Sequence, residues 1–165
     1  VNVIMWSWCG QVEDKYTSNT LYSQYLTPMA DLEAAYPTVT FVYMTGHVDH
    51  DEDAKNKAAN GIIRDFCETN NKVLYDFADI ESWNPDGEWF LDQGCNDNGD
   101  YSGGNWAVEW CAVNPGSDLC DSCSCAHSQP LNCNRKGRAF WWMMARAAEQ
   151  WTMALLMALK QAWPA

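Results

Sequence analysis

One histidine, His127, lies in a cysteine-rich segment toward the carboxyl end of the chain. An imidazole can act as the general base of acyl transfer when a carboxylate holds it in one tautomer. Asp118 and Asp121 are the nearest acidic residues in the sequence, and we expect Asp121 to orient the imidazole. The sequence therefore predicts a catalytic pair in which His127 is the base and Asp121 is its acid partner.

The thiols around this histidine allow two kinds of chemistry. Thiolates and an imidazole are zinc ligands, so a metal site that includes His127 is one alternative. The segment lacks a second well-spaced cysteine or histidine pair, and eight cysteines in 165 residues are typical of a disulfide-bearing secreted protein. We therefore expect disulfides here, and we expect Cys9 to be buried or disulfide-bonded rather than catalytic. The group consists of Cys120, Cys123, Cys125 and Cys133.

Three short apolar runs predict buried strands, and they lie at residues 1–7, 39–45 and 72–77. Each run is rich in Val, Ile, Tyr or Phe and does not alternate regularly with polar residues. This pattern is typical of parallel strands that are covered on both faces. The sequence therefore predicts an α/β fold with a right-handed parallel sheet.

Helical patterns fill the intervals between these runs, and a last helix follows the cysteine-rich segment. The expected helices cover residues 21–35, 53–69 and 135–162. Within the first, we expect Thr27 to cap a new helical start with Pro28 at its first position. The apolar end of the last helix is expected to pack on the sheet or against a second copy of the chain, as a homo-oligomer.

Polar residues follow the first two predicted strands, where open parallel sheets bind their ligands. Ser7, Gly10 and Gln11 come after the first strand, and His47 comes after the second. The backbone N–H of Gly10 and the amide of Gln11 are candidate oxyanion donors. Ser7 and His47 are candidate substrate-binding residues at the same edge of the sheet.

A long loop-rich region at residues 81–134 carries two further candidate features. Residues 96–100, with the sequence NDNGD, space oxygen ligands as part of a calcium loop does, although a Gly/Asn-rich turn is the commoner outcome. Several tryptophans could stack on sugar rings or form a small core for the region. They are Trp83, Trp89, Trp106 and Trp110.

Composition limits the class of protein. Hydrophobic residues make up 47% of the chain, which is enough for the core of one domain covering residues 1–165. The net charge of −12 excludes nucleic acid as a partner, because phosphates require Lys and Arg. We expect an extracellular protein without a membrane span. Because the chain starts inside an apolar run, we also expect an upstream segment to be missing.

Four segments together resemble secreted bacterial and archaeal proteins of the SGNH (GDSL-like) hydrolase family. They read VIMWSWCGQ at residues 3–11, FVYMTGH at 41–47, LYDFADIE at 74–81 and CAHSQPLN at 125–132. The resemblance implies a flavodoxin-like, three-layer α/β/α sandwich with a disulfide-stapled loop and a C-terminal helix. It also implies hydrolysis of esters on carbohydrates or lipids without a cofactor, with His127 at the position of the catalytic histidine.

The chain departs from the family pattern at three positions. No Gly-Asp-Ser block is present, the Gly-x-Asn-Asp block is replaced at residues 7–11, and Ser124 stands where the acidic residue of the Asp-x-x-His block would be. An alternative function is therefore a non-catalytic module with a hydrolase-like fold that binds carbohydrate or supports assembly. A metal-binding protein built on the Cys/His segment is the second alternative.

Overall fold

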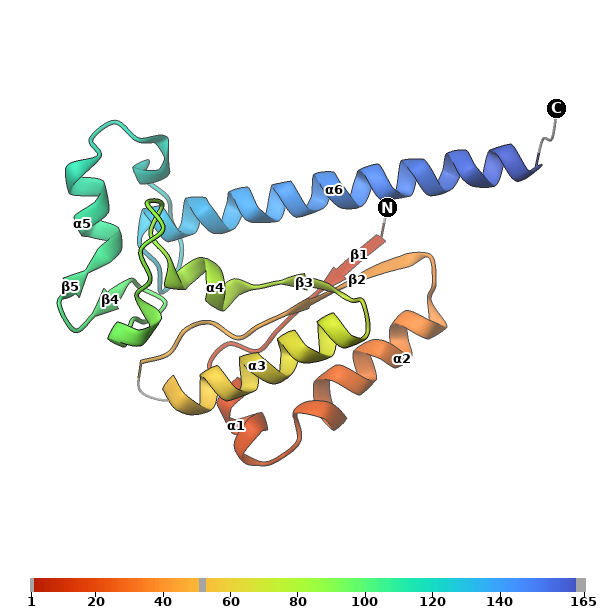
Figure 1. Ribbon diagram of the computed structural model, residues 1–165, viewed down its shortest axis with the longest axis horizontal. Helices are drawn as coiled ribbons and strands as arrows, with labels where there is room; N and C mark the ends of the chain where they lie inside the picture. The colour runs from red at the N-terminus through yellow and green to blue at the C-terminus, as the bar shows by residue number, and fades with distance from the viewer. Residues whose placement is uncertain (1, 51–52, 163–165) are drawn as a thin grey trace.

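A parallel sheet of three strands forms the centre of the computed structural model, which describes residues 2–50 and 53–162, with side chains at 3–50 and 54–148 (Figure 1). The order is β1-β2-β3, with β2 pairing in parallel with both neighbours. The prediction of three parallel strands is confirmed, although each strand is shorter than its apolar run. The expectation that all three are buried on both faces is wrong for the outer strands, since Ile4 and Val73 are exposed. The strands are β1 (Asn2–Met5), β2 (Val39–Met44) and β3 (Val73–Tyr75).

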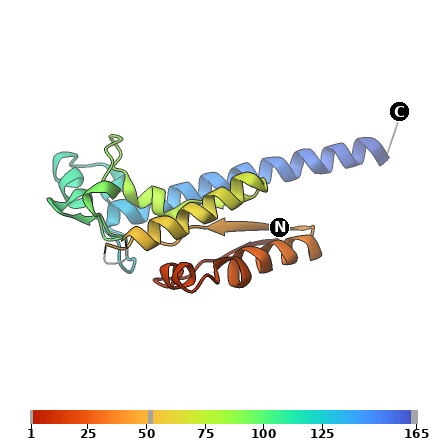
Figure 2. The same cartoon turned by 60° about the horizontal axis from the view of Figure 1, so that its bottom comes forward.

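Helices from the first half of the chain pack against one face of this sheet, and Figure 2 shows those of residues 12–35 together beneath β2. Phe41 and Tyr43 of β2 point into this layer and pack with Tyr25, Met29 and Ile63, which are all fully buried. Alternate residues of a strand face opposite sides, so this face is set by the odd-numbered residues of β2. The helices are α1 (Val12–Thr17), η1 (Tyr22–Leu26), α2 (Thr27–Ala35) and α3 (Asp53–Thr69).

Helix α2 begins at Thr27 with Pro28 in its first turn as expected, but the expectation that Thr27 caps this helix is wrong. Leu26 and Thr27 both have helical backbone angles, and no side chain caps the start of α2. A π-helical turn, η1, leads directly into α2, so the chain is continuously helical from residue 22 to residue 35. Pro28 fits because it lies in the first turn of α2, where a proline fits without loss of a helical hydrogen bond.

The opposite face of the sheet packs against α4 (Phe77–Ser82) and the first half of the long helix α6 (Pro130–Ala162). Val42 and Tyr75 contact Met143 of α6, and the Tyr75 hydroxyl donates to the carbonyl of Lys136 at 2.6 Å. Figure 1 shows α6 running past the edge of the sheet. The side chains expected to pair with a second copy lie at residues 149–162, outside the described side chains.

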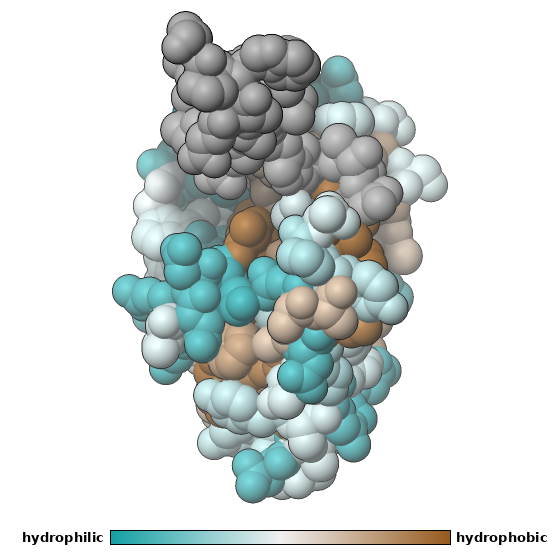
Figure 3. Space-filling model, turned by 90° about the vertical axis from the view of Figure 1, so that its right-hand side faces the viewer, coloured by the Kyte–Doolittle hydropathy of each residue, from teal (hydrophilic) through white to brown (hydrophobic). Residues whose placement is uncertain are grey.

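Hydrophobic side chains reach the surface in several places, as the view toward the end of α6 shows (Figure 3). Among the described residues, Trp141 and Trp142 are the most exposed tryptophans, at 72% and 65%.

No helix in the described part of the chain is long and apolar enough to cross a membrane.

The loop-rich region forms a second small core instead of an open loop. Phe90 stacks on Trp106 with ring centroids 5.5 Å apart, and Leu131 of α6 packs against them. A disulfide between Cys111 and Cys120 staples this region, which confirms the expected disulfide-stapled loop. The remaining elements are η2 (Leu91–Gln93), β4 (Asp100–Tyr101), β5 (Gly104–Asn105), α5 (Trp106–Val113) and η3 (Asp118–Cys120).

A single buried hydroxyl links the ends of β1 and β2. The Tyr25 hydroxyl accepts a hydrogen bond from the N–H of Met44 at 2.8 Å and donates to the carbonyl of Trp6 at 3.0 Å. Tyr25→Phe leaves the Met44 N–H without its acceptor, so we expect a loss of about 1–3 kcal/mol of unfolding free energy in urea titration. Tyr22→Phe, at an exposed tyrosine of the same helical segment, is the matched control and should change little.

Candidate active site

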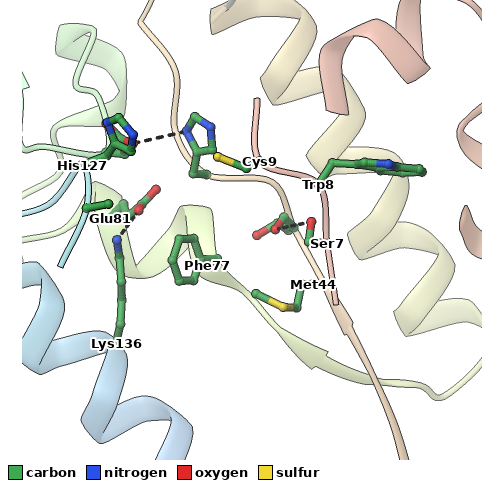
Figure 4. A pocket seen from close by; sticks show the side chains of 12 residues that line it. Ser7, Trp8, Cys9, Met44, Phe77, Glu81, His127 and Lys136 are labelled. Carbon is green, nitrogen blue, oxygen red and sulfur yellow. Dashed lines mark hydrogen bonds and ion pairs between the residues drawn. The ribbon is translucent and has the colours of Figure 1, made fainter. Parts of the chain in front are cut away.

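A cleft of about 290 Å³ opens at the carboxyl ends of the three parallel strands (Figure 4). This is the edge at which parallel sheets bind ligands, and the predicted candidates Ser7, His47 and His127 all reach it. Trp8, Met44 and Phe77 supply apolar surface. The complete lining is Ser7, Trp8, Cys9, Met44, Thr45, His47, Phe77, Glu81, Asp97, Ala126, His127 and Lys136.

His127 adopts a strained backbone conformation in the loop before α6. Its φ angle is +52°, in the left-handed region that residues other than glycine rarely adopt. Neighbouring contacts hold this conformation: Ser128 Oγ donates to the carbonyl of Asp97 at 3.4 Å, and Gln129 Nε2 donates to Asn98 Oδ1 at 3.0 Å. These contacts fix the loop that carries His127 against the loop that carries Asp97.

Asp97 is a carboxylate of the cleft that interacts with both of its histidines. Its Oδ2 is 3.7 Å from Nδ1 of His47, and it interacts electrostatically with His127 as well. Burial raises the pKa of Asp97 above its ordinary value, and the two histidines and Lys136 oppose this rise. Asp97 is therefore the candidate orienting carboxylate of the cleft, and it comes from the turn that was considered as a calcium loop.

Asp121, the acid expected from the sequence, lies at the end of η3 and is not among the residues that line the cleft. Its backbone carbonyl accepts a hydrogen bond from Asn134 Nδ2 at 2.9 Å. The sequence reasoning missed Asp97 because it lies about 30 residues before His127, and only the fold brings the two loops together. The one sequence signal for Asp97 was its position in an Asn/Asp-rich turn of a long loop, because binding and catalytic residues often lie in loops.

The remaining sequence candidates, Gly10, Gln11 and Ser7, follow the first strand. Gly10 has a φ of +68°, and a Cβ at this position would lie 3.8 Å from His47 Nε2, so the glycine passes close to the imidazole. Gln11 is exposed at the start of α1, where its carbonyl accepts from the N–H of Lys15. Ser7 Oγ donates to the carbonyl of Thr45 at 3.3 Å. Ser7 and His47 line the cleft. Gly10 and Gln11 are not among the lining residues, but they directly follow Cys9, which is.

A buried ion pair supports the wall of the cleft. Glu81 is completely buried, and its Oε1 lies 2.5 Å from Nζ of Lys136 on α6. Its Oε2 accepts the N–H of Val48 at 2.7 Å, which ties α4 to the segment after β2. Lys136 also lies 4.2 Å from the ring centroid of Phe77. Sequence reasoning did not single out Glu81 or Lys136, because an isolated Glu or Lys is usually solvent-exposed.

Burial raises the pKa of Glu81 to about 7, although Lys136 and the Val48 N–H oppose the rise. The folded protein therefore binds a proton at Glu81 more tightly than the unfolded chain does, so this residue's contribution to stability falls as pH rises from about 4.5 to about 7. We expect wild type to lose about 3 kcal/mol more than Glu81→Gln across this window. Urea titrations at the two ends of the window measure the difference, and equal losses in both proteins would contradict it.

The turn at residues 96–100 uses its oxygens within the protein. Asn96 Oδ1 accepts the backbone N–H groups of Asn98 and Asp100, both at 3.0 Å. The Asp100 carboxylate accepts from Asn98 Nδ2 at 3.1 Å and from Asn105 Nδ2 at 2.8 Å. These donors occupy the oxygens that the calcium interpretation would assign to a cation, so the geometry is that of a hydrogen-bonded turn.

The eight cysteines differ in bonding and exposure. Cys111 and Cys120 form a disulfide, whereas Cys67 and Cys95 are buried and lie outside any disulfide. Cys9 is exposed and free on the cleft, so the expectation that it is buried or bonded is wrong. Outside the cleft, three cysteine sulfurs lie close enough together to hold a metal ion: Cys123, Cys125 and Cys133.

No family model, curated protein or solved structure matches this chain. The functional argument therefore rests on the geometry of the cleft and on the chemistry of the residues that line it.

Proposed function

We propose that the chain is an ester hydrolase that uses the cleft at the ends of the parallel strands, with His127 as general base and Asp97 as its orienting carboxylate. One observation carries the proposal: two loops distant in sequence are held together so that His127 and the partly buried carboxylate of Asp97 line the same cleft. Helices on both faces of a parallel sheet support the flavodoxin-like, three-layer architecture that the SGNH resemblance implies.

In the proposed reaction His127 takes a proton from the attacking water as the water oxygen bonds to the ester carbonyl carbon. Asp97 stabilises the imidazolium that forms, and the imidazolium then returns the proton to the departing alkoxide as the ester C–O bond breaks. We assign the attack to water because Ser7, the serine on the cleft lining, already donates to the carbonyl of Thr45. The N–H of Gly10 and the Gln11 amide remain the proposed donors to the oxyanion.

The cleft favours a small, uncharged ester. A volume of about 290 Å³ matches a small acyl group with part of its alcohol, such as an acetylated sugar or a short lipid ester. Trp8 and Phe77 provide ring faces against which apolar faces of either substrate could lie. The chain's net charge of −12 disfavours anionic esters. The Cys111–Cys120 disulfide supports the proposal of an extracellular location.

The test is hydrolysis of p-nitrophenyl acetate by the purified chain. His127→Gln should lower kcat/KM by about 10²–10⁴-fold, the usual contribution of a general base. His50→Ala is the matched control, since His50 lies in an adjoining polar hollow but not on the cleft, and it should retain the wild-type rate. Equal rates in wild type and His127→Gln would refute the proposal. Loss of activity in Cys9→Ala would replace water by the Cys9 thiol as the attacking group.

A second candidate function, binding of carbohydrate without catalysis, is favoured by a separate hollow of about 220 Å³ in the loop-rich region. Phe90, Trp106 and Trp110 line it beside acidic residues, and Trp110 Nε1 donates to Asp86 Oδ2 at 2.8 Å. Aromatic faces beside carboxylates are suited to sugar rings and their hydroxyl groups. The test is binding of acetylated oligosaccharides. Loss of binding in Trp110→Ala, with binding preserved in His127→Gln, would support this function.

A further inference from the structure

Three cysteine sulfurs converge on one point near the start of α6. The Sγ atoms of Cys123, Cys125 and Cys133 all lie within 4.8 Å of one another, and Cys133 contacts both of the others. A sulfur atom can form only one disulfide, so Cys133 cannot be bonded to both partners at once. At least one thiol of the three therefore remains outside any disulfide within the group, unlike the fully paired Cys111–Cys120 bridge.

The position of these sulfurs is fixed by the start of a regular helix. Cys133 lies in the first turn of α6, which begins at Pro130, while Cys123 and Cys125 come from the loop that precedes this helix. Three thiolates at one point repel one another unless a cation joins them, and thiolates are ligands of choice for zinc-like ions.

We propose that the reduced chain binds one thiophilic cation of the zinc class at Cys123, Cys125 and Cys133. Three thiolates with water as the fourth ligand would complete the tetrahedral coordination that zinc prefers. Because Cys125 and His127 belong to the same loop, the bound ion would tie the loop that carries His127 to the first turn of α6. This site is separate from the cleft, and its existence does not depend on the proposed ester hydrolysis.

The test is a titration of the phosphine-reduced full chain with Co²⁺, followed by displacement with Zn²⁺. We expect one equivalent of Co²⁺ per chain with thiolate charge-transfer absorption, and bands of a tetrahedral ion that Zn²⁺ removes. Cys133→Ser and Cys125→Ser should each weaken binding by more than about 100-fold, because each removes a direct ligand. Cys9→Ser is the matched cysteine control and should bind as wild type does.

Two controls separate this site from other sites. His47→Ala removes an imidazole of the cleft, so unchanged Co²⁺ binding in this variant places the ion at the cysteines. Alkylation of the wild-type chain gives a readout that needs no variant: Zn²⁺ should protect Cys123, Cys125 and Cys133 while Cys9 still reacts. The proposal is overturned if the reduced chain binds no Co²⁺, if Cys133→Ser binds normally, or if Zn²⁺ leaves all three thiols reactive.

Discussion

Asp97→Asn is expected to lower ester hydrolysis by about 10²–10⁴-fold, with little change in stability. Asparagine has nearly the shape of aspartate, but it has no charge to stabilise the imidazolium of His127. It can also turn its amide toward the imidazole and favour the wrong tautomer. The partial burial that raises the pKa of Asp97 strengthens its electrostatic effect on both histidines. The measurement is kcat/KM for p-nitrophenyl acetate.

Asp121→Asn is the matched control, because Asp121 is the acid that sequence spacing alone selects. Its position at the end of η3, outside the lining of the cleft, predicts a rate equal to that of wild type. If Asp121→Asn loses activity while Asp97→Asn hydrolyses the ester normally, then Asp121 and not Asp97 is the acid partner of His127. Circular dichroism and urea titration of both variants show whether a loss of rate arises from unfolding.

Lys136→Met is expected to destabilise the protein by about 2–3 kcal/mol near pH 9, where Glu81 is ionised in the folded wild type but must take up a proton once its cation is removed. The substitution keeps the apolar stem of the lysine but leaves the fully buried Glu81 carboxylate without its cation. It also removes the hydrogen bond from Lys136 Nζ to Ser128 Oγ, at 3.1 Å, next to His127. Adding Glu81→Gln to Lys136→Met should restore most of the loss, because a glutamine side chain is uncharged and its amide oxygen can still accept the Val48 N–H.

Arg138→Met is the control for this second prediction. Arg138 lies on the same helix and pairs with Asp118 at 2.6 Å, but both side chains are more than half exposed, at 56% and 74%. Exposed pairs contribute only about 0–1 kcal/mol, so its loss should be small in the same urea titration. If Lys136→Met and Arg138→Met destabilise the protein equally, the Glu81–Lys136 pair does not hold α4 and α6 together.

The sequence predicts the sheet well because each strand is a short apolar run between helical patterns, and this signal can be recognised locally. The run at residues 39–45 becomes the central strand β2, and helix α3 begins and ends within the predicted range. The cap expected at Thr27 was wrong because local capping preferences were outweighed by the buried contacts of Tyr25, Leu26 and Met29 on both sides of it. A continuous helix keeps these residues on the sheet.

The site was predicted only where a residue's position follows from a strand end. Ser7 and His47 reach the cleft because they follow β1 and β2, and His127 reaches it through the loop before α6. Asp97 and Glu81 were missed because their roles depend on partners from other elements, His127 and Lys136. Neither partnership has a local sequence pattern, since both are created by the docking of the loop-rich region and α6 onto the sheet.

The pH dependence of kcat/KM for p-nitrophenyl acetate, measured for wild type and His127→Gln, tests the central claim most directly. If His127 is the general base, the wild-type rate rises as one group loses its proton, and His127→Gln keeps only a low rate without this rise. A variant profile that matches wild type in height and shape would contradict the assignment of His127, and with it the proposal that this cleft hydrolyses esters.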